Sequence, residues 1–405
     1  MHPLYSLPGH CTDHSLQPSP HSPEKMRFPK HQQNLFRHCH QRHEIEPPAS
    51  HCEPSNEKRQ NHKQNSILHY TVYDREYDER GTIDTYESEV IGLKYDFSKT
   101  LNETISFGLG SEYKYDWGYF DNNGSSYSSS TKGNIDNIAI YSNLGLKLFK
   151  NTNLSFFARN DDHKQTGNNS TYKLNLNYNF DKLELGLSRM TGLRNPTLYE
   201  LYGSDSNGYA GNRSLNAEKS VTNEFYSNYY INNNLTLSTK LFRSNTFNNI
   251  EYVSSPSKKY INDNDDTNLD QSGVNGNIYF KAKNIDINFF ASFLSSKTET
   301  SSDAKRRPEK NYGLNLNKKI HLKYLGELNL YTKFKHYGKH FDTHSSTFAT
   351  IEMDSTDIVD FTISKKLEGY LFSLNIDNLL NENYQRPHGY PQNRRQLRIG
   401  FRKIF

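Results

Sequence analysis

The sequence lacks any run of about twenty apolar residues, so no segment of it could cross a membrane as a single α-helix. This absence does not exclude the strands of a membrane β-barrel, because each strand needs only about ten residues and half of them face water. The 49 basic and 45 acidic residues nearly balance, and no basic stripe is present. Nucleic acid is therefore not expected as a partner.

Cysteine occurs only near the N-terminus, as Cys11, Cys39 and Cys52, and the 340 residues after position 65 contain none. This usage suits an oxidising envelope compartment but fits other compartments as well. The N-terminus also lacks a charged region followed by an apolar one, so the signal peptide that an envelope protein needs is absent from the sequence as it stands.

Residues 1–65 differ in composition from the rest of the chain. They hold ten of the 17 histidines, nine of the 14 prolines and one of the 29 tyrosines, and show no sustained period of 2 or 3.6. We predict a disordered or non-native N-terminal extension, and favour a mis-started or out-of-frame segment as its origin. A zinc site is the alternative, but the spacing matches no familiar zinc module, so no metal site is predicted. Its ligands would be Cys39, His40, His43 and Cys52.

The segment 172–188, YKLNLNYNFDKLELGLS, shows the pattern of the remaining chain. Apolar residues such as Leu174 and Leu176 alternate with polar ones such as Asn175 and Asn177, which places the two kinds on opposite faces of a strand. In a soluble sandwich the apolar face covers a protein core. In an outer-membrane barrel it contacts lipid, and the polar face lines a watery lumen.

The region 66–405 is predicted to contain about sixteen strands, whose length matches a tilted membrane crossing better than a globular sheet. Short and long connections alternate, as in outer-membrane barrels, which have short periplasmic turns and long extracellular loops. A soluble sandwich has no reason to sort loop lengths in this way. We therefore predict an all-β fold, an antiparallel transmembrane β-barrel in the cell outer membrane. The strands are expected near 66–75, 86–98, 102–118, 135–149, 152–161, 170–180, 183–191, 219–231, 234–250, 271–282, 284–296, 311–320, 327–337, 357–367, 369–378 and 395–404, and the long links are 119–134, 192–218, 251–270, 297–310 and 338–356.

The long link 192–218 and the residues that follow read GLRNPTLYELYGSDSNGYAGNRSLNAEKS. This stretch resembles the barrel motif of TonB-dependent outer-membrane receptors, in which Pro and Leu-x-x-Leu-Tyr precede Gly-Asn-x-x-Leu-x-x-Glu-Lys. Arg213 and Ala217 stand where the family usually has proline. The matching residues are Pro196, Leu198, Leu201, Tyr202, Gly211, Asn212, Leu215, Glu218 and Lys219.

The C-terminal stretch LFSLNIDNLLNENYQRPHGYPQNRRQLRIGFRKIF is similar to the ending of the same family, with an Asn-Leu turn, a Gly-Tyr loop, an arginine and a final phenylalanine. The phrases HGYPQNRR (388–395) and AKRRPEKN (304–311) look most like the cobalamin receptor branch. The residues that fill the ending are Asn378, Leu379, Asn381, Tyr384, Gly389, Tyr390, Arg394 and Phe405.

The resemblance covers roughly residues 66–405 and implies a barrel of 22 strands with an N-terminal plug that contacts TonB. On this basis about sixteen family strands are present, and the plug and about six strands are missing. The implied function is uptake of a metal chelate such as cobalamin or a siderophore, with outer-membrane lipid, TonB and the chelate as partners. The alternatives are a passive porin-like channel and a soluble or surface-attached β-rich binding or adhesive protein.

Tyr202, Tyr209 and Tyr260 lie in long links, and their rings could stack on a planar ligand. No enzyme activity and no cofactor are expected, because no nucleophile elbow, zinc helix or phosphate loop is present. The acidic run 262–271 fits no EF-hand and is interpreted as a polar loop. The loop residues His336, His340 and His344 are interpreted as solvated, and no metal or hydrolase site is predicted from them and the nearby Asp342.

Overall fold

The computed structural model describes residues 62–79, 82–123, 128–206, 208–253, 259–262, 268–298, 304–347 and 349–403. Nearly all of the predicted N-terminal extension, with its three cysteines, lies outside these residues, as do Phe405 and residues 263–267 of the acidic run. No helix in the described part of the chain is long and apolar enough to span a membrane.

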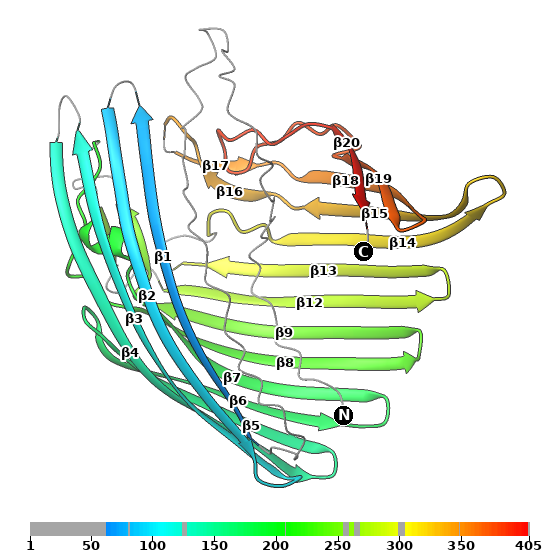
Figure 1. Cartoon of the computed structure of the whole chain (residues 1–405), viewed down its shortest axis with the longest axis horizontal. Helices are drawn as coiled ribbons and strands as arrows, with labels where there is room; N and C mark the ends of the chain where they lie inside the picture. The colour runs from blue at the N-terminus through cyan, green and yellow to red at the C-terminus, as the bar shows by residue number, and fades with distance from the viewer. Residues whose placement is uncertain are drawn as a thin grey trace. The chain divides into compact units, whose positions relative to one another are not determined.

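Sixteen antiparallel strands of the described residues form one sheet, and strands that are neighbours along the chain are neighbours in the sheet (Figure 1). Each strand predicted from the sequence overlaps one observed strand, so the predicted all-β sheet is confirmed. Two small hairpins and one short helix lie in the links. The sheet strands are β1 (His62–Glu79), β2 (Thr82–Thr100), β3 (Ile105–Asn123), β4 (Ser128–Phe149), β5 (Thr152–His163), β6 (Gly167–Asn179), β7 (Leu183–Arg194), β8 (Glu218–Asn232), β9 (Leu235–Phe247), β12 (Leu269–Ala282), β13 (Ile285–Lys297), β14 (Lys310–Leu322), β15 (Gly326–Tyr337), β18 (Thr356–Leu367), β19 (Tyr370–Asp377) and β20 (Gln396–Lys403). The inserted elements are α1 (Leu198–Tyr202) and the strand pairs β10 (Ile250–Val253) with β11 (Lys259–Asn262) and β16 (His340–Thr343) with β17 (Thr350–Met353).

The two faces of the sheet differ as the alternation predicts. We call the face that bears Leu174, Leu187 and Leu314 the outer face and the face that bears Asn175 and Asn315 the inner face; all three leucines are exposed. Cross-strand pairs keep the faces aligned, since residues that pair in an antiparallel sheet point to the same side. The outer face therefore presents apolar rows that no described part of the chain covers, as expected of a surface in contact with lipid.

Cysteine substitutions at Leu174 and Leu314 test this assignment. In bilayers we expect both thiols to react with a lipid-soluble maleimide and at least about tenfold more slowly with a charged one, and thiols at Asn175 and Asn315 to show the reverse order. Mass spectrometry of the labelled protein measures the rates. Protection of Leu174→Cys and Leu314→Cys from both reagents in plain buffer, by a folded interior, would refute it.

Link length depends on the end of the sheet. At one end all seven links have two to four residues, for example 150–151 and 283–284. The other end, which we call the long-link end, carries three short links between the first six strands and five long links after them. The long links are 195–217, 248–268, 298–309, 338–355 and 378–395. By the barrel rule, the long-link end is extracellular.

The predicted long link 119–134 is wrong, because β3 continues to Asn123 and β4 begins at Ser128. Its serines and glycines suggested a loop, but the serine side chains bond across the hairpin. Asn122 Nδ2 donates to Ser129 Oγ (3.0 Å), and Ser130 Oγ donates to the Tyr119 hydroxyl (3.0 Å). These pairs, together with the ladder from Phe120↔Thr131 outward, extend the strands beyond the predicted ends.

Candidate functional site

Residues 195–217, the link between β7 and β8, are called the roof loop. It begins with α1, a helix of five residues, which starts at a capping box. Thr197 Oγ1 accepts from the backbone N–H of Glu200 (3.2 Å), and Glu200 Oε2 accepts from the N–H of Thr197 (2.8 Å). The sequence Thr-x-x-Glu thus satisfies two backbone donors that the first turn would otherwise leave unpaired. Arg194 joins this turn to β8 through ion pairs with Glu200 (3.1 Å) and Glu218 (2.6 Å).

The motif leucines form a small core beneath the roof loop. Leu201 and Leu215 are fully buried against Ile135 of β4 and Ile250 of β10. Gly211 packs so closely that a Cβ atom there would lie 2.5 Å from the backbone of Leu201, which explains glycine at this position. Leu201, Gly211 and Leu215 of the motif therefore hold the roof loop in place.

Contacts of the roof loop span many strands of the sheet. Toward the N-terminal strands, Asn122 Nδ2 donates to Ser204 Oγ (2.6 Å), and Ser206 Oγ donates to Asp84 Oδ2 (3.1 Å). In the other direction, Asn212 Nδ2 donates to the carbonyl of Tyr260 (2.9 Å) on β11. Since the loop leaves the sheet between β7 and β8, it reaches from the ends of β2 and β3 to the link beyond β9.

Four tyrosines form an aromatic cluster in and beside the roof loop: Tyr199, Tyr209, Tyr252 and Tyr260. Tyr199 and Tyr209 stack at 4.7 Å between ring centroids, and Tyr260 meets Tyr209 edge-on at 5.8 Å. Tyr252 packs on Tyr260 at 5.4 Å. Burial raises the pKa of all four phenols, so they remain neutral and can donate hydrogen bonds at physiological pH.

The structure places the three predicted ligand residues close together but gives them different surroundings. Tyr209 is 2% exposed and donates its hydroxyl to the carbonyl of Tyr199 (2.7 Å), so its ring is part of the scaffold. Tyr202 is half-buried, with the Arg213 guanidinium 5.0 Å from its ring centroid. Tyr260 is half-buried, and its ring packs against the ring of Tyr252.

Tyr252, which the sequence prediction missed, is 48% exposed and is the member of the aromatic cluster most open to a ligand. It pairs directly with Tyr260 in the β10–β11 hairpin. The signal that could have found it is the short run IEYV at 250–253, where the predicted strand 234–250 meets the predicted long link 251–270; this run indicates a strand opposite Tyr260.

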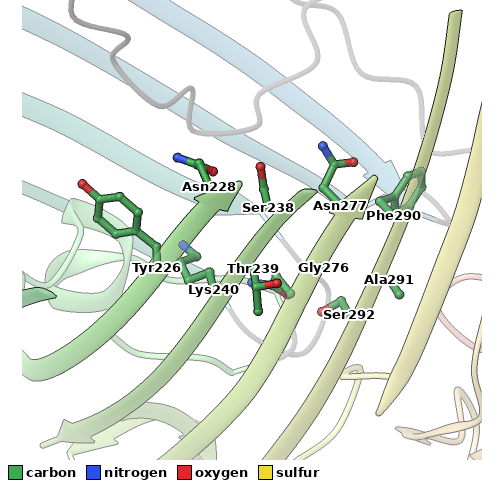
Figure 2. A pocket seen from close by; sticks show the side chains of 11 residues that line it. Tyr226, Asn228, Ser238, Thr239, Lys240, Gly276, Asn277, Phe290, Ala291 and Ser292 are labelled. Carbon is green, nitrogen blue, oxygen red and sulfur yellow. The ribbon is translucent and has the colours of Figure 1, made fainter. Parts of the chain in front are cut away.

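A hollow of about 350 Å³ lies on the inner face of β8, β9, β12 and β13. Figure 2 shows Asn228, Ser238 and Asn277 projecting into it from neighbouring strands. Lys240 supplies a cation that pairs with Glu224 (3.2 Å). Amide, hydroxyl and ammonium side chains thus line the hollow together with the apolar residues Phe290 and Ala291.

Three long links meet at the carboxylate of Asp342, which is fully buried. Its Oδ1 accepts hydrogen bonds from Arg306 Nε (2.7 Å) and from the backbone N–H of Thr343 (2.7 Å). Its Oδ2 accepts a hydrogen bond from the backbone N–H of His388 (2.8 Å). We call this arrangement the Asp342 clasp. The sequence alone gives no sign of this arrangement, because Arg306 and His388 lie 36 and 46 residues away from Asp342 along the chain.

The histidines near Asp342 do not gather around it. His336 stacks on Tyr312 at 4.4 Å and bonds to Asp357 (2.7 Å), while His344 lies against His388 at 4.4 Å. Within the described ranges, no group of three or more His, Cys, Asp or Glu residues is arranged to hold a metal ion.

The C-terminal motif residues shape turns. Asn378 and Asn381 adopt positive φ angles of 51° and 61°, which asparagine tolerates better than most residues. The Asn378 side chain also donates to the carbonyl of Glu382 (2.9 Å) and accepts from its N–H (2.9 Å). Gly389 has a φ of 86°, a region that favours glycine. These residues place the link 378–395 at the Asp342 clasp.

A sixteen-stranded antiparallel sheet with uncovered apolar rows outside, polar groups inside and long structured links at one end defines the wall of an outer-membrane β-barrel of the receptor class. The family model described as "TonB dependent receptor-like, beta-barrel" matches residues 53–379, and the chain belongs to this family. It is therefore an outer-membrane protein. A receptor barrel is not an enzyme, so family membership confirms that expectation.

Solved structures share this fold. Over 85% of this chain, FpvA from P. aeruginosa, solved with a pyoverdine and iron, has a TM-score of 0.70 at 11% identity. The FrpB iron transporter from Neisseria meningitidis has a TM-score of 0.67 at 12% identity over 84% of this chain. The ferric yersiniabactin uptake receptor FyuA from Yersinia pestis has a TM-score of 0.63 at 15% identity, also over 84% of this chain. The chain spans 54%, 59% and 56% of these three proteins. A comparison with curated protein sequences found no match.

Proposed function

We propose that the chain is the barrel of a receptor that binds an iron–siderophore chelate at the long-link end and imports it with energy delivered through TonB. The observation that carries the proposal is the aromatic cluster, which holds one exposed ring, Tyr252. Elsewhere on the roof loop, the Arg213 guanidinium lies 5.0 Å from the ring centroid of the half-buried Tyr202. Aromatic faces and a guanidinium suit an anionic chelate whose ligand groups include flat rings. The compared structures support an iron chelate, since their names refer to ferric yersiniabactin, pyoverdine with iron, or iron.

Cobalamin is the alternative ligand, suggested by the phrases at 388–395 and 304–311. In the structure both segments supply partners to the Asp342 clasp, Arg306 from one and His388 from the other. Their resemblance therefore concerns how the links are held together, and it favours no particular ligand. A passive porin-like channel is the alternative function, whereas a soluble β-rich adhesive protein is excluded by family membership.

Replacing Tyr252 with alanine is expected to weaken binding of a ferric siderophore about tenfold, because loss of one stacked ring costs on the order of 1.4 kcal/mol. The measurement is quenching of intrinsic fluorescence in the detergent-solubilised chain, titrated with ferric catecholate, hydroxamate and phenolate siderophores. Tyr324→Ala is the matched control, since Tyr324 is 89% exposed but lies in a turn at the opposite end of the sheet.

Three outcomes would contradict the proposal. Quenching by cyanocobalamin and by no ferric chelate would favour the cobalamin alternative. Swelling of liposomes in small sugars, with no binding of any chelate, would favour the porin-like channel. An equal effect of Tyr324→Ala and Tyr252→Ala would remove the aromatic cluster from the site.

A further inference from the structure

A continuous apolar row crosses the outer face of five neighbouring strands. Its residues pair in register from β7 to β13, and each is between 36% and 56% exposed. With no described protein over it, this row is placed to contact acyl chains. The row consists of Leu187, Phe225, Leu241, Val274 and Phe293.

The next row toward the long-link end is polar and carries two arginines. In it Arg189 pairs with Asn223 of β8, which pairs with Arg243 of β9. Two strand spacings separate the arginine backbones, about 10 Å. Two arginine side chains at that separation can converge on one group between them. All three residues are exposed on the same outer face as the apolar row.

Arg189 has unused capacity for an anion. Its Nε donates to the Tyr172 hydroxyl (3.1 Å) and its Nη1 to Asn223 Oδ1 (3.1 Å), both neutral groups. No carboxylate in the described part of the chain forms an ion pair with it, and three of its five N–H donors remain for another partner. The oxygen of Asn223 is taken by Arg189, which leaves the amide N–H groups of Asn223 to donate as well.

Arg243 is paired with Asp270 through Nη2 (2.9 Å) and Nε (3.3 Å), yet its side chain is 65% exposed. Lys297 pairs in register with Asp270 in the following row, again on the outer face. Arg189, Arg243 and Lys297 carry three positive charges against the single carboxylate of Asp270, so the surface has a net positive charge just above the apolar row.

We propose that Arg189, Asn223 and Arg243 bind a phosphate of an outer-leaflet lipid headgroup. An arginine fork matches phosphate oxygens, and a cation at the edge of the hydrocarbon is stabilised by an anion at the same depth. The adjoining apolar row favours a phosphate that is attached to acyl chains, because those chains can contact the row. A free inorganic anion makes no such contact. The inference is independent of which chelate the receptor binds.

The test is native mass spectrometry of the detergent-solubilised chain with lipid A, a diphosphorylated glycolipid, and with its dephosphorylated form. Wild-type protein is expected to bind lipid A at least about tenfold more tightly than the dephosphorylated form, and the double variant Arg189→Gln, Arg243→Gln is expected to lose that difference. The control is Lys318→Gln, which is expected to behave as wild type. Lys318 is an exposed cation on the outer face, but it lies near the opposite end of the sheet, close to the link 323–325.

The β-sheet circular dichroism signal, measured on the same samples, shows whether the double variant is folded. If the double variant does not fold, Arg189→Lys replaces it, which keeps the charge but loses the fork, and an intermediate loss is expected. Equal binding of both lipids, wild-type selectivity in the variant, or an equal effect of Lys318→Gln would overturn the proposal. Competition by millimolar inorganic phosphate would also overturn it, because the site would then bind a free anion.

Discussion

Replacing Asp342 with alanine is expected to release three long links at once. The carboxylate accepts hydrogen bonds from Arg306, from Thr343 and from His388, which belong to the links 298–309, 338–355 and 378–395. Hydrogen bonds to a charged group contribute about 1.5–3 kcal/mol each, and losing them together should lower the free energy of local opening by at least about 3 kcal/mol. Hydrogen exchange at the amides of Thr343 and His388 should then accelerate about a hundredfold.

Asp354→Ala is the matched control for this prediction. Its carboxylate is 96% exposed and lies 3.8 Å from Lys339, so its removal should leave exchange nearly unchanged. Asp342→Asn separates charge from shape, because the amide fills the same volume but cannot accept at every position. Exchange at His388 that is the same in wild type and Asp342→Ala would show that the links are held by other contacts.

The same carboxylate makes the links sensitive to acid. Burial by itself would raise the pKa of Asp342, but the bonds from Arg306 and two backbone N–H groups outweigh it and hold the pKa below the ordinary value of 3.8. Because the pKa of Asp342 is lower in the folded state, its carboxylate stabilises the links fully at any pH above the ordinary pKa. This stabilisation is lost as the pH falls through the folded-state pKa. Protection at His388 should therefore persist at pH 5 and be lost only below pH 3.8, as the pH falls through the lowered pKa of Asp342.

Replacing Tyr209 with alanine is expected to disrupt the aromatic cluster more than removal of any exposed ring. Tyr209 is almost fully buried and contacts Tyr199, Tyr252 and Tyr260, so alanine leaves a cavity at their centre. Truncating a buried aromatic residue costs about 3–5 kcal/mol. We expect faster exchange at the amide of Asn212, which donates to the carbonyl of Glu200, and a loss of chelate affinity greater than the tenfold expected for Tyr252→Ala.

Tyr209→Phe is the control, since it keeps the ring and removes only the hydroxyl that donates to the carbonyl of Tyr199. That bond should contribute about 1 kcal/mol, so the phenylalanine variant should stay close to wild type in both measurements. If phenylalanine and alanine are equally harmful, the hydroxyl rather than the ring holds the roof loop. If neither has an effect, the aromatic cluster does not depend on Tyr209.

The strands could be predicted from the sequence because their signal is local. The alternation of Leu174, Asn175 and Leu176 is enough to predict which face of the sheet each side chain lies on. This prediction needs no knowledge of the neighbouring strands. The link 119–134 was mispredicted for a related reason. Its serines look like loop residues in isolation, and only their bonds to Tyr119 and Asn122 across the hairpin make them part of a strand.

The site was harder to predict, because its contacts join distant segments. Family motifs located Leu201, Gly211 and Leu215, and the structure shows that these residues pack within and beneath the roof loop. Tyr209, predicted as a ligand residue, is almost fully buried in the structure. The exposed Tyr252 was not among the predicted residues, because its strand has only four residues and leaves little periodic signal. The Asp342 clasp has no periodic pattern at all, since its partners come from three separate links.

The reach of the roof loop has a consequence for the order of folding. Every strand of the sheet pairs with the next strand along the chain, so the wall can assemble hairpin by hairpin with little loss of loop-closure entropy. Ser204 and Ser206, however, meet Asn122 and Asp84 across 82 and 122 residues. The roof loop can therefore reach its final contacts only after β2, β3 and β11 are in place, so the long-link end is expected to order later than the hairpins of the sheet.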